Sequence, residues 1–264
     1  MTIGNLLQHA TTLLFNAGCS SPDIDAERLL CHTLGLSRVD LYLNTSRPLT
    51  PDEIQQCEMP LHLRVTRLPL QYILRETEFM SLPFSVNPSV LIPRPETEVL
   101  VETVIDRLRR LAPPHPTVAD IGTGSGVIAV ALAHFLPQTV VYATDTSDIA
   151  LRIARLNTKR NGVIDRVFFL KGDVTAPLTC QLDALVSNPP YIPTDDISKL
   201  PLEVRDHEPR QALDGGPDGL RYYRRLVPEA TNLLKNGGIL GLEVGGEGQA
   251  KAVGEMIEKT ARFQ

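Results

Sequence analysis

The sequence contains few cysteines, and they do not form the patterns of metal-bound or disulfide-rich proteins. Cys19, Cys31, Cys57 and Cys180 are far apart, include no C-x-x-C pair and have no histidine at ligand spacing. This excludes the common zinc sites and a disulfide framework. We therefore expect four free thiols and no metal site.

Long apolar runs are also missing. The longest begins at Val127 and stops at His134, well short of the roughly 20 residues that a membrane-spanning helix needs. Residues 1–5 lack both the basic start and apolar core of a signal peptide and the arginine-rich bias of a transit peptide. The sequence therefore predicts a cytoplasmic protein that does not enter a membrane.

An excess of positive charge is absent as well. The net charge is −5 and the pI is near 5.7, so the usual electrostatic signature of nucleic-acid binding is missing. Arginines cluster within 107–110, 152–160 and 221–225, and each cluster lies in an expected helix. We interpret these clusters as solvated helix faces and expect no direct binding of nucleic acid.

The first part of the chain has the apolar spacing of helices. Residues 3–17 place their apolar side chains on one helical face, and Ser21 followed by Pro22 begins a second helix. A short third helix follows Ser37, and Thr50 starts a capping box for a fourth helix, which Pro60 is expected to kink or split. Residues 1–72 are therefore predicted to form a small helical bundle, followed by a β-hairpin linker over 73–92.

From residue 117 onward, apolar strands alternate with helices. The expected strands are 118–121, 140–143, 167–170, 182–186 and 239–244, and the expected helices are 126–135, 148–161, 219–235 and 248–261. This alternation predicts an α/β domain over 93–264 with a doubly wound parallel sheet. Ligands of such sheets bind at the carboxyl ends of the strands.

A glycine-rich turn joins the first of these strands to its helix. The turn covers 120–126, with the sequence Asp-Ile-Gly-Thr-Gly-Ser-Gly, and its glycines allow a ligand to approach the backbone closely. The dinucleotide fingerprint requires glycine or alanine where this chain has Val127. The turn therefore favours a nucleoside without a pyrophosphate, such as S-adenosylmethionine, over a nicotinamide cofactor.

Two more aspartates follow the next two strands. Asp145 ends the second strand, where a carboxylate can accept hydrogen bonds from both ribose hydroxyls. Asp173 ends the third strand, where it can accept from an adenine amino group. Taken alone, each is as well explained as a helix N-cap, but three acidic strand ends in succession favour a ligand site.

The fourth strand stops at a rigid elbow. Its residues are Ser187, Asn188, Pro189, Pro190 and Tyr191, and the two prolines remove backbone donors and fix φ. The Asn188 side chain adds an acceptor oxygen, and Tyr191 adds a flat ring. An acceptor-rich turn of this kind is suited to holding a planar NH2 group.

Together these motifs resemble the HemK/PrmC family, class I methyltransferases that methylate the glutamine of the Gly-Gly-Gln motif in peptide chain release factors. The likeness covers nearly the whole chain and rests on 93–98 (Pro-Arg-Pro-Glu-Thr-Glu), 120–126, 188–191 (Asn-Pro-Pro-Tyr), the loop 208–216 and the glycine pair 237–238. It implies a Rossmann-like S-adenosylmethionine-dependent methyltransferase sheet with a substrate-recognising helical bundle. It also implies class I release factors as partners and a monomer.

The resemblance further implies roles for individual residues. Asn188 and Pro189 would accept hydrogen bonds from the glutamine amide, Tyr191 would pack on it as the third catalytic residue, and Pro190 and Arg94 would contact the substrate. The cofactor would be S-adenosylmethionine, converted to S-adenosylhomocysteine and held by Asp120, Gly122, Thr123, Gly124, Gly126, Asp145, Asp173 and Asn188.

Other functions remain open from the sequence. The Asn-Pro-Pro-Tyr motif also suits methylation of a nucleic-acid amino group or of a ribosomal-protein glutamine, and a catalytically silent methyltransferase fold is a further reading. Two positions depart from the family, since Arg75 and Ser81 stand where glycines are usual and would strain a turn that requires positive φ. The chain also ends before the last two strands expected in such a sheet.

Overall fold

The computed structural model describes residues 1–260. Its internal contacts divide the chain into two compact units. The first, the helical unit, contains Met1–Arg75 and Pro201–His207; the second, the sheet unit, contains Glu76–Leu200 and the chain from Glu208 onward. Among the described residues, no helix is both long enough and apolar enough to cross a membrane.

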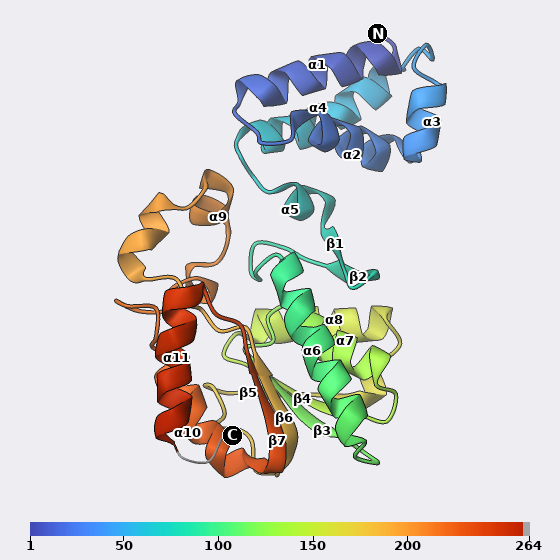
Figure 1. Cartoon of the computed structure of the whole chain (residues 1–264). Helices are drawn as coiled ribbons and strands as arrows, with labels where there is room; N and C mark the ends of the chain where they lie inside the picture. The colour runs from blue at the N-terminus through green and yellow to red at the C-terminus, as the bar shows by residue number, and fades with distance from the viewer. Residues whose placement is uncertain (261–264) are drawn as a thin grey trace. The chain divides into compact units, whose positions relative to one another are not determined.

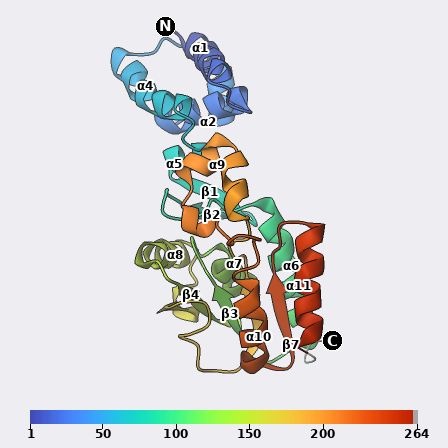
Figure 2. The same ribbon diagram turned by 90° about the vertical axis from the view of Figure 1, so that its left-hand side faces the viewer.

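The helical unit is built from helices of five to fifteen residues (Figures 1 and 2). They are α1 (Ile3–Asn16), α2 (Pro22–Leu34), α3 (Arg38–Leu43), α4 (Pro51–Val65), α5 (Leu70–Leu74) and α9 (Leu202–His207). The expected capping box at Thr50 is present, and Thr2 and Ser37 form two more. Each box satisfies amides that would otherwise lack a partner. Helix α4 runs through Pro60 as one helix, where the sequence predicted a kink or a split.

The segment 201–207 joins the helical unit through a buried ionic cluster, a contact that the sequence did not suggest. Arg64 is only 4% exposed, and its guanidinium binds Asp25 at 2.7 Å and Glu203 at 3.2 Å. Arg67 binds the same Glu203 carboxylate at 2.7 Å. Because a buried guanidinium requires counter-charges, Glu203 anchors its segment to α4 and to Arg67 just after it.

The sheet unit begins with the predicted hairpin, formed by β1 (Glu76–Phe79) and β2 (Leu82–Ser85). Arg75 and Ser81 both have φ of 60°, so the strain expected at these two positions is present. Phe79 and Phe84 are fully buried and meet edge to face, with ring centroids 6.1 Å apart. This aromatic pair fixes the hairpin in spite of its strained turn.

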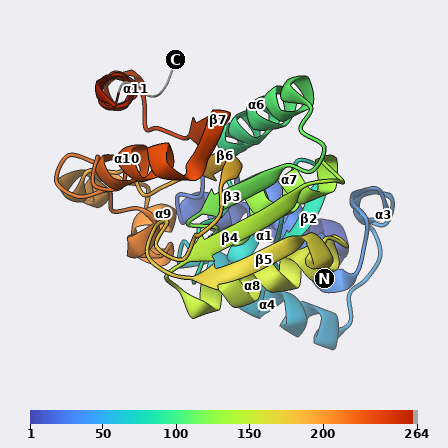
Figure 3. The same cartoon turned by 90° about the horizontal axis from the view of Figure 1, so that it is seen from below.

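All five predicted strands are present and form one parallel sheet in the order β5-β4-β3-β6-β7 (Figure 3), although the last begins at Leu234 and ends at Leu242 and does not span 239–244. They are β3 (Thr117–Ile121), β4 (Val140–Asp145), β5 (Val167–Lys171), β6 (Leu182–Ser187) and β7 (Leu234–Leu242). The helices of this unit are α6 (Pro95–Leu111), α7 (Val127–Phe135), α8 (Asp148–Arg160), α10 (Tyr223–Leu233) and α11 (Glu247–Lys259), with the short 3-10 helices η1 (Ile164–Arg166), η2 (Thr194–Lys199) and η3 (Arg210–Ala212). The expectation of missing strands concerns the chain beyond Thr260, outside the described residues.

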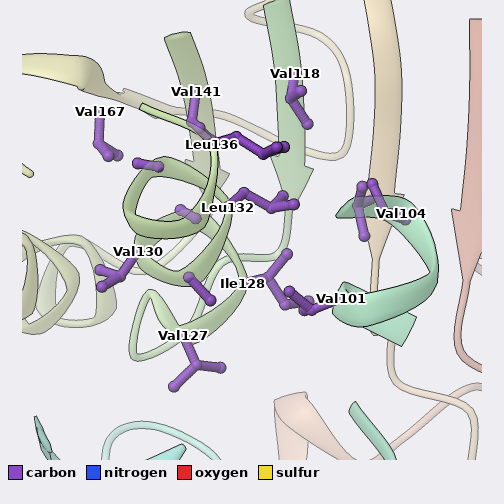
Figure 4. Close-up of a cluster of buried hydrophobic side chains, with 14 of the residues drawn as sticks. Val101, Val104, Val118, Val127, Ile128, Val130, Leu132, Leu136, Val141 and Val167 are labelled. Atoms are coloured by element: carbon purple, nitrogen blue, oxygen red, sulfur yellow. The ribbon is translucent and has the colours of Figure 1, made fainter. Parts of the chain in front are cut away.

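Alternate residues of the strands pack into two apolar cores, one on each face of the sheet. Figure 4 shows the core beneath α7, where Val118 and Val141 from the strands lie against Leu132 and Leu136. On the other face, Ala119 and its neighbours pack against α10. Since both faces are covered, the strands read as continuous apolar runs, which is why the sequence revealed them.

Candidate active site

The topology places a pocket where the strand order reverses. Strands β4 and β5 extend from one side of β3, and β6 and β7 extend from the other. At such a switch point a crevice opens outside the carboxyl ends of the strands. Eight of the predicted site residues line it: Gly122, Thr123, Gly124, Asp145, Asp173, Asn188, Pro189 and Pro190.

The glycine turn does two separate things. Gly122 and Gly124 have positive φ, and a Cβ added to Gly122 would meet nothing within 4 Å, so these two glycines leave the backbone open to a ligand. A Cβ at Gly126 would lie 2.9 Å from the Cβ of Ala154. Gly126 does not line the pocket, and instead allows α7 and α8 to pack closely.

Asp120 also lies behind the pocket wall. It is completely buried, and its Oδ2 accepts hydrogen bonds from Thr123 Oγ1 at 2.6 Å and from the Ala129 amide at 3.1 Å. Its Oδ1 has no hydrogen-bond partner among the described residues. Burial raises the pKa of Asp120 to about 7. The carboxyl group ties the glycine turn to the first turn of α7.

Asp145 lines the pocket with a fixed carboxylate. Its Oδ2 accepts from the Gly124 amide at 2.9 Å and its Oδ1 from the Ser147 amide at 2.8 Å. The N-cap of α8 is Ser147, which accepts from the Ala150 amide, so Asp145 is not the cap of that helix. Since a carboxylate oxygen accepts two hydrogen bonds, both oxygens retain capacity for ligand hydroxyls.

Asp173 lies at the edge of the pocket and is shared with α10. Its Oδ2 accepts from Arg225 Nη1 at 2.8 Å. The next residue, Val174, has φ of 53°, which is rare for a β-branched side chain. The Thr144 hydroxyl donates to the Val174 carbonyl at 3.1 Å and helps to hold this turn at the pocket wall.

The elbow after β6 is tied to its neighbours by hydrogen bonds. The Ser187 hydroxyl donates to the Ile121 carbonyl at 2.7 Å, and the Glu243 amide donates to the Ser187 carbonyl at 3.1 Å. Asn188 Nδ2 donates to Thr97 Oγ1 at 3.1 Å. The side-chain amide of Asn188 is thus held from behind by the first turn of α6.

Tyr191 does not line the pocket. A Cβ at Gly245 would lie 2.9 Å from the Tyr191 ring, so the ring packs on that glycine. Its hydroxyl donates to Glu243 Oε1 at 3.4 Å. Burial raises the pKa of Tyr191, and the nearby Glu243 charge adds to this. Tyr191 therefore donates as a neutral phenol.

Arg94 does not line the pocket either, and its side chain binds other residues of the protein. Its guanidinium binds the Glu208 carboxylate and donates to the Ile92 carbonyl at 2.9 Å. Glu208 also accepts from the Ile92 amide at 3.3 Å. Burial raises the pKa of Glu208, and the Arg94 charge opposes this rise. This ion pair connects the segment before α6 to the loop that carries Pro209 and Ala212 to the pocket.

Sequence reasoning missed two polar residues of this region, Thr97 and Glu243. Thr97 lies within the 93–98 motif, where only Arg94 had a proposed role. Glu243 directly follows β7, so the rule that acids at strand ends mark a ligand site would have found it. No group of His, Cys, Asp and Glu that could hold a metal ion occurs in residues 1–260.

Comparison with known proteins identifies the family. Residues 5–74 match the family model of the PrmC N-terminal domain, and residues 95–200 match that of the methyltransferase small domain. The solved N-terminal domain of human METTL16 in complex with SAH shares the fold, with a TM-score of 0.50 and 17% identity over 76% of this chain and 74% of that one.

Two relatives match almost the whole chain. The release factor glutamine methyltransferase of Moorella thermoacetica is 45% identical over 265 residues, which cover 100% of this chain and 92% of the relative. That of Geobacter sulfurreducens is 47% identical over 260 residues, covering 98% of this chain and 89% of the relative. The chain therefore belongs to the release factor glutamine methyltransferase family.

Proposed function

We propose that the protein methylates the side-chain amide nitrogen of the glutamine in the Gly-Gly-Gln motif of class I peptide chain release factors. The observation that carries this proposal is the position of Asn188. Its amide lines the same pocket as the glycine turn, and its NH2 group is held by Thr97. The names of the relatives support the choice of substrate.

The pocket fits S-adenosylmethionine as the methyl donor. Gly122 and Gly124 leave open space next to the backbone, and in the proposal Asp145, which lines the pocket, accepts hydrogen bonds from two ribose hydroxyls. Asp173 is available to the adenine amino group in this proposal, with Arg225 as its second partner. When bound, the cofactor supplies a methyl group already activated by a positively charged sulfur. SAH bound to a protein of the same fold supports this choice.

In the proposal, the elbow compensates for the weak nucleophilicity of the glutamine amide nitrogen. The lone pair of an amide nitrogen is delocalised, as the barrier of about 18–20 kcal/mol to rotation about the peptide bond shows. In the proposal, Asn188 Oδ1 and the Pro189 carbonyl accept the two N–H hydrogens of the glutamine. These contacts polarise the nitrogen and aim it at the methyl group. The prolines keep the elbow rigid, so in this proposal both acceptors are held in place before the substrate binds.

Tyr191 and Arg94 do not line the pocket, and in this proposal each of them positions a segment that does. Tyr191 orders the elbow through Glu243, and Arg94 orders the loop of Pro209 through Glu208. The helical bundle, residues 1–72, recognises the release factor. We place the protein in the cytoplasm as a monomer that binds no nucleic acid directly.

The test is methyl transfer from radiolabelled S-adenosylmethionine. We expect label in a class I release factor and none in its Gly-Gly-Gln→Gly-Gly-Ala variant, which retains the whole binding surface. DNA, ribosomal RNA and ribosomal proteins serve as parallel substrates. Label in any of these, with none in the release factor, would replace the proposal with methylation of a nucleic-acid amino group or a ribosomal-protein glutamine.

A further inference from the structure

The side-chain amide of Asn188 stands at the end of a short hydrogen-bond relay. Asn188 Nδ2 donates to Thr97 Oγ1 at 3.1 Å, and Thr97 Oγ1 donates to Glu243 Oε2 at 2.6 Å. Thr97 is 2% exposed and Glu243 is 8% exposed, so water does not compete for these contacts. The residues come from the elbow, the first turn of α6 and the end of β7.

The relay has a direction that follows from its chemistry. A threonine hydroxyl has one hydrogen, and an ionised carboxylate can only accept. Thr97 must therefore donate to Glu243, and its remaining lone pairs can only accept. The NH2 side of Asn188 must face Thr97, because the reversed amide would place two acceptor oxygens against each other.

We propose that Thr97 and Glu243 are positioning residues that fix the Asn188 amide with its Oδ1 presented to the substrate. An asparagine side chain without this relay has two orientations of nearly equal shape, and one of them presents a donor to the glutamine NH2. This inference rests on the proposed function, because it assigns a cause to the acceptor role of Asn188.

Glu243 is itself held in place. Its Oε1 accepts from the Tyr191 hydroxyl at 3.4 Å, and its backbone carbonyl accepts from the Tyr223 hydroxyl at 2.6 Å. The carboxylate thus has one partner on the elbow and one on α6, while α10 fixes its backbone. Tyr191, for which the resemblance implied a catalytic role, thus also holds the carboxylate of the relay.

The first experiment separates the hydroxyl of Thr97 from its shape. Thr97→Val keeps the branched side chain and removes the donor and acceptor, whereas Thr97→Ser keeps the hydroxyl. Thr103→Val is the matched control, since Thr103 is an exposed residue of the same helix that donates to the Val99 carbonyl. The measurements are kcat and KM with the release factor, and Kd for S-adenosylmethionine by calorimetry.

We expect Thr97→Val to lower kcat by about 10²-fold, the typical effect of losing one preorganised polar contact, with Kd changed less than twofold. Thr97→Ser restores most of kcat, and Thr103→Val behaves as the unaltered protein. Equal losses in Thr97→Ser and Thr97→Val, or no loss in Thr97→Val, would overturn the inference.

Glu243→Gln tests the direction of the relay. A glutamine side chain can accept from Thr97 or donate to it, so it no longer dictates which side of Asn188 faces the hydroxyl. Burial raises the pKa of Glu243 and the Glu96 charge on α6 adds to this rise, whereas hydrogen bonds from Thr97, Tyr191 and Asn188 oppose it. We expect kcat of the unaltered protein to fall toward acid pH as Glu243 takes up a proton, and kcat of Glu243→Gln to be low without that fall. If Glu243→Gln keeps the full kcat and shows the same fall of kcat toward acid pH, the relay is contradicted.

A readout independent of turnover separates this inference from the proposed function. The side-chain NH2 resonances of Asn188, identified by their loss in Asn188→Ala, report the hydrogen bond to Thr97 in nitrogen–proton NMR spectra. We expect them to shift and exchange faster with solvent in Thr97→Val, but not in Thr103→Val. If the protein did not methylate a release factor, this result would still decide whether Thr97 orients Asn188. Unchanged resonances in a folded Thr97→Val protein would refute the relay.

Discussion

Asn188 is the residue on which the proposed chemistry depends most directly. We expect Asn188→Ala to lower kcat for release factor methylation by about 10²–10³-fold, because it removes the acceptor on which the proposed reaction relies. Binding of S-adenosylmethionine is retained, since Gly122, Gly124 and Asp145 are unaltered. Single-turnover methyl transfer and calorimetry measure the two effects.

The control for this substitution is Asn232→Ala, which removes an exposed amide from α10. It is expected to change neither measurement. Near-normal turnover in Asn188→Ala would show that the elbow does not hold the reacting group, and the assignment of Asn188 would be wrong.

Asp120 gives a prediction about stability and pH. Burial raises its pKa from 3.8 to about 7 in the folded protein. Between these values the folded state holds a proton that the unfolded state has lost, so this group stabilises the fold most below pH 4 and loses that contribution as pH rises toward 7. The free energy of unfolding, relative to that of Asp120→Asn, is therefore expected to fall over this range.

Urea denaturation of both proteins at pH values from 4.5 to 7.5 measures this difference. Asp165→Asn, which removes an exposed carboxylate from η1, shows the effect of charge removal alone. A difference between the unaltered protein and Asp120→Asn that stays constant or grows with pH would contradict the raised pKa.

At the scale of elements, the Arg94–Glu208 pair connects the start of α6 to the loop of η3. Arg94→Ala leaves a buried carboxylate without its counter-charge, which costs ~3–5 kcal/mol for a fully buried pair. Because the Arg94 side chain is 31% exposed, we expect a loss of about 2 kcal/mol. The loss becomes smaller toward acid pH, since protonation neutralises Glu208.

The double variant Arg94→Ala/Glu208→Gln tests what Arg94 does. A glutamine oxygen can still accept from the Ile92 amide and carries no charge, so we expect the double variant to regain part of the lost free energy of unfolding and of kcat. If Arg94 acted only by contacting the substrate, adding Glu208→Gln would restore neither quantity. Urea denaturation and steady-state methylation distinguish these outcomes.

The elements that the sequence predicted are those with strong local signals. Strands β3, β4 and β6 are apolar runs whose residues are mostly buried, and the starts of α2 and α4 follow short-range motifs. The glycine turn, Asp145 and Asn188 could be located because parallel strands bring their carboxyl ends to one edge. The Asn188–Thr97–Glu243 relay could not, because its contacts join positions 91 and 146 residues apart and no local pattern records them.

At the scale of the whole molecule, the helical unit is discontinuous in sequence. It recruits Pro201–His207, a segment too short to show an apolar period, through ion pairs that span 136 and 139 residues. A boundary drawn from the sequence at residue 72 therefore separates Arg64 from one of its counter-charges. Each unit is therefore made of two separate segments of the chain, and a segment of the other unit lies between them in sequence.

Glu203→Gln tests this arrangement in the intact chain. It weakens two ion pairs to Arg64 and Arg67, so we expect faster trypsin cleavage at Arg205 and faster amide exchange over 201–207. Glu58→Gln is the control, because Glu58 is an exposed residue of α4 in the same unit. Equal cleavage rates in Glu203→Gln and Glu58→Gln would show that the ionic cluster does not hold the segment.

The fixed amide of Asn188 has a consequence for damaged substrates. Glutamine deamidates to glutamate, which differs from it only by an oxygen in place of the NH2 group. A pocket whose Asn188 can present only oxygen, next to a proline carbonyl, would repel that carboxylate on both sides. A deamidated release factor has no amide nitrogen to methylate, and in the proposed reaction this repulsion would also keep it from occupying the pocket in place of an intact factor.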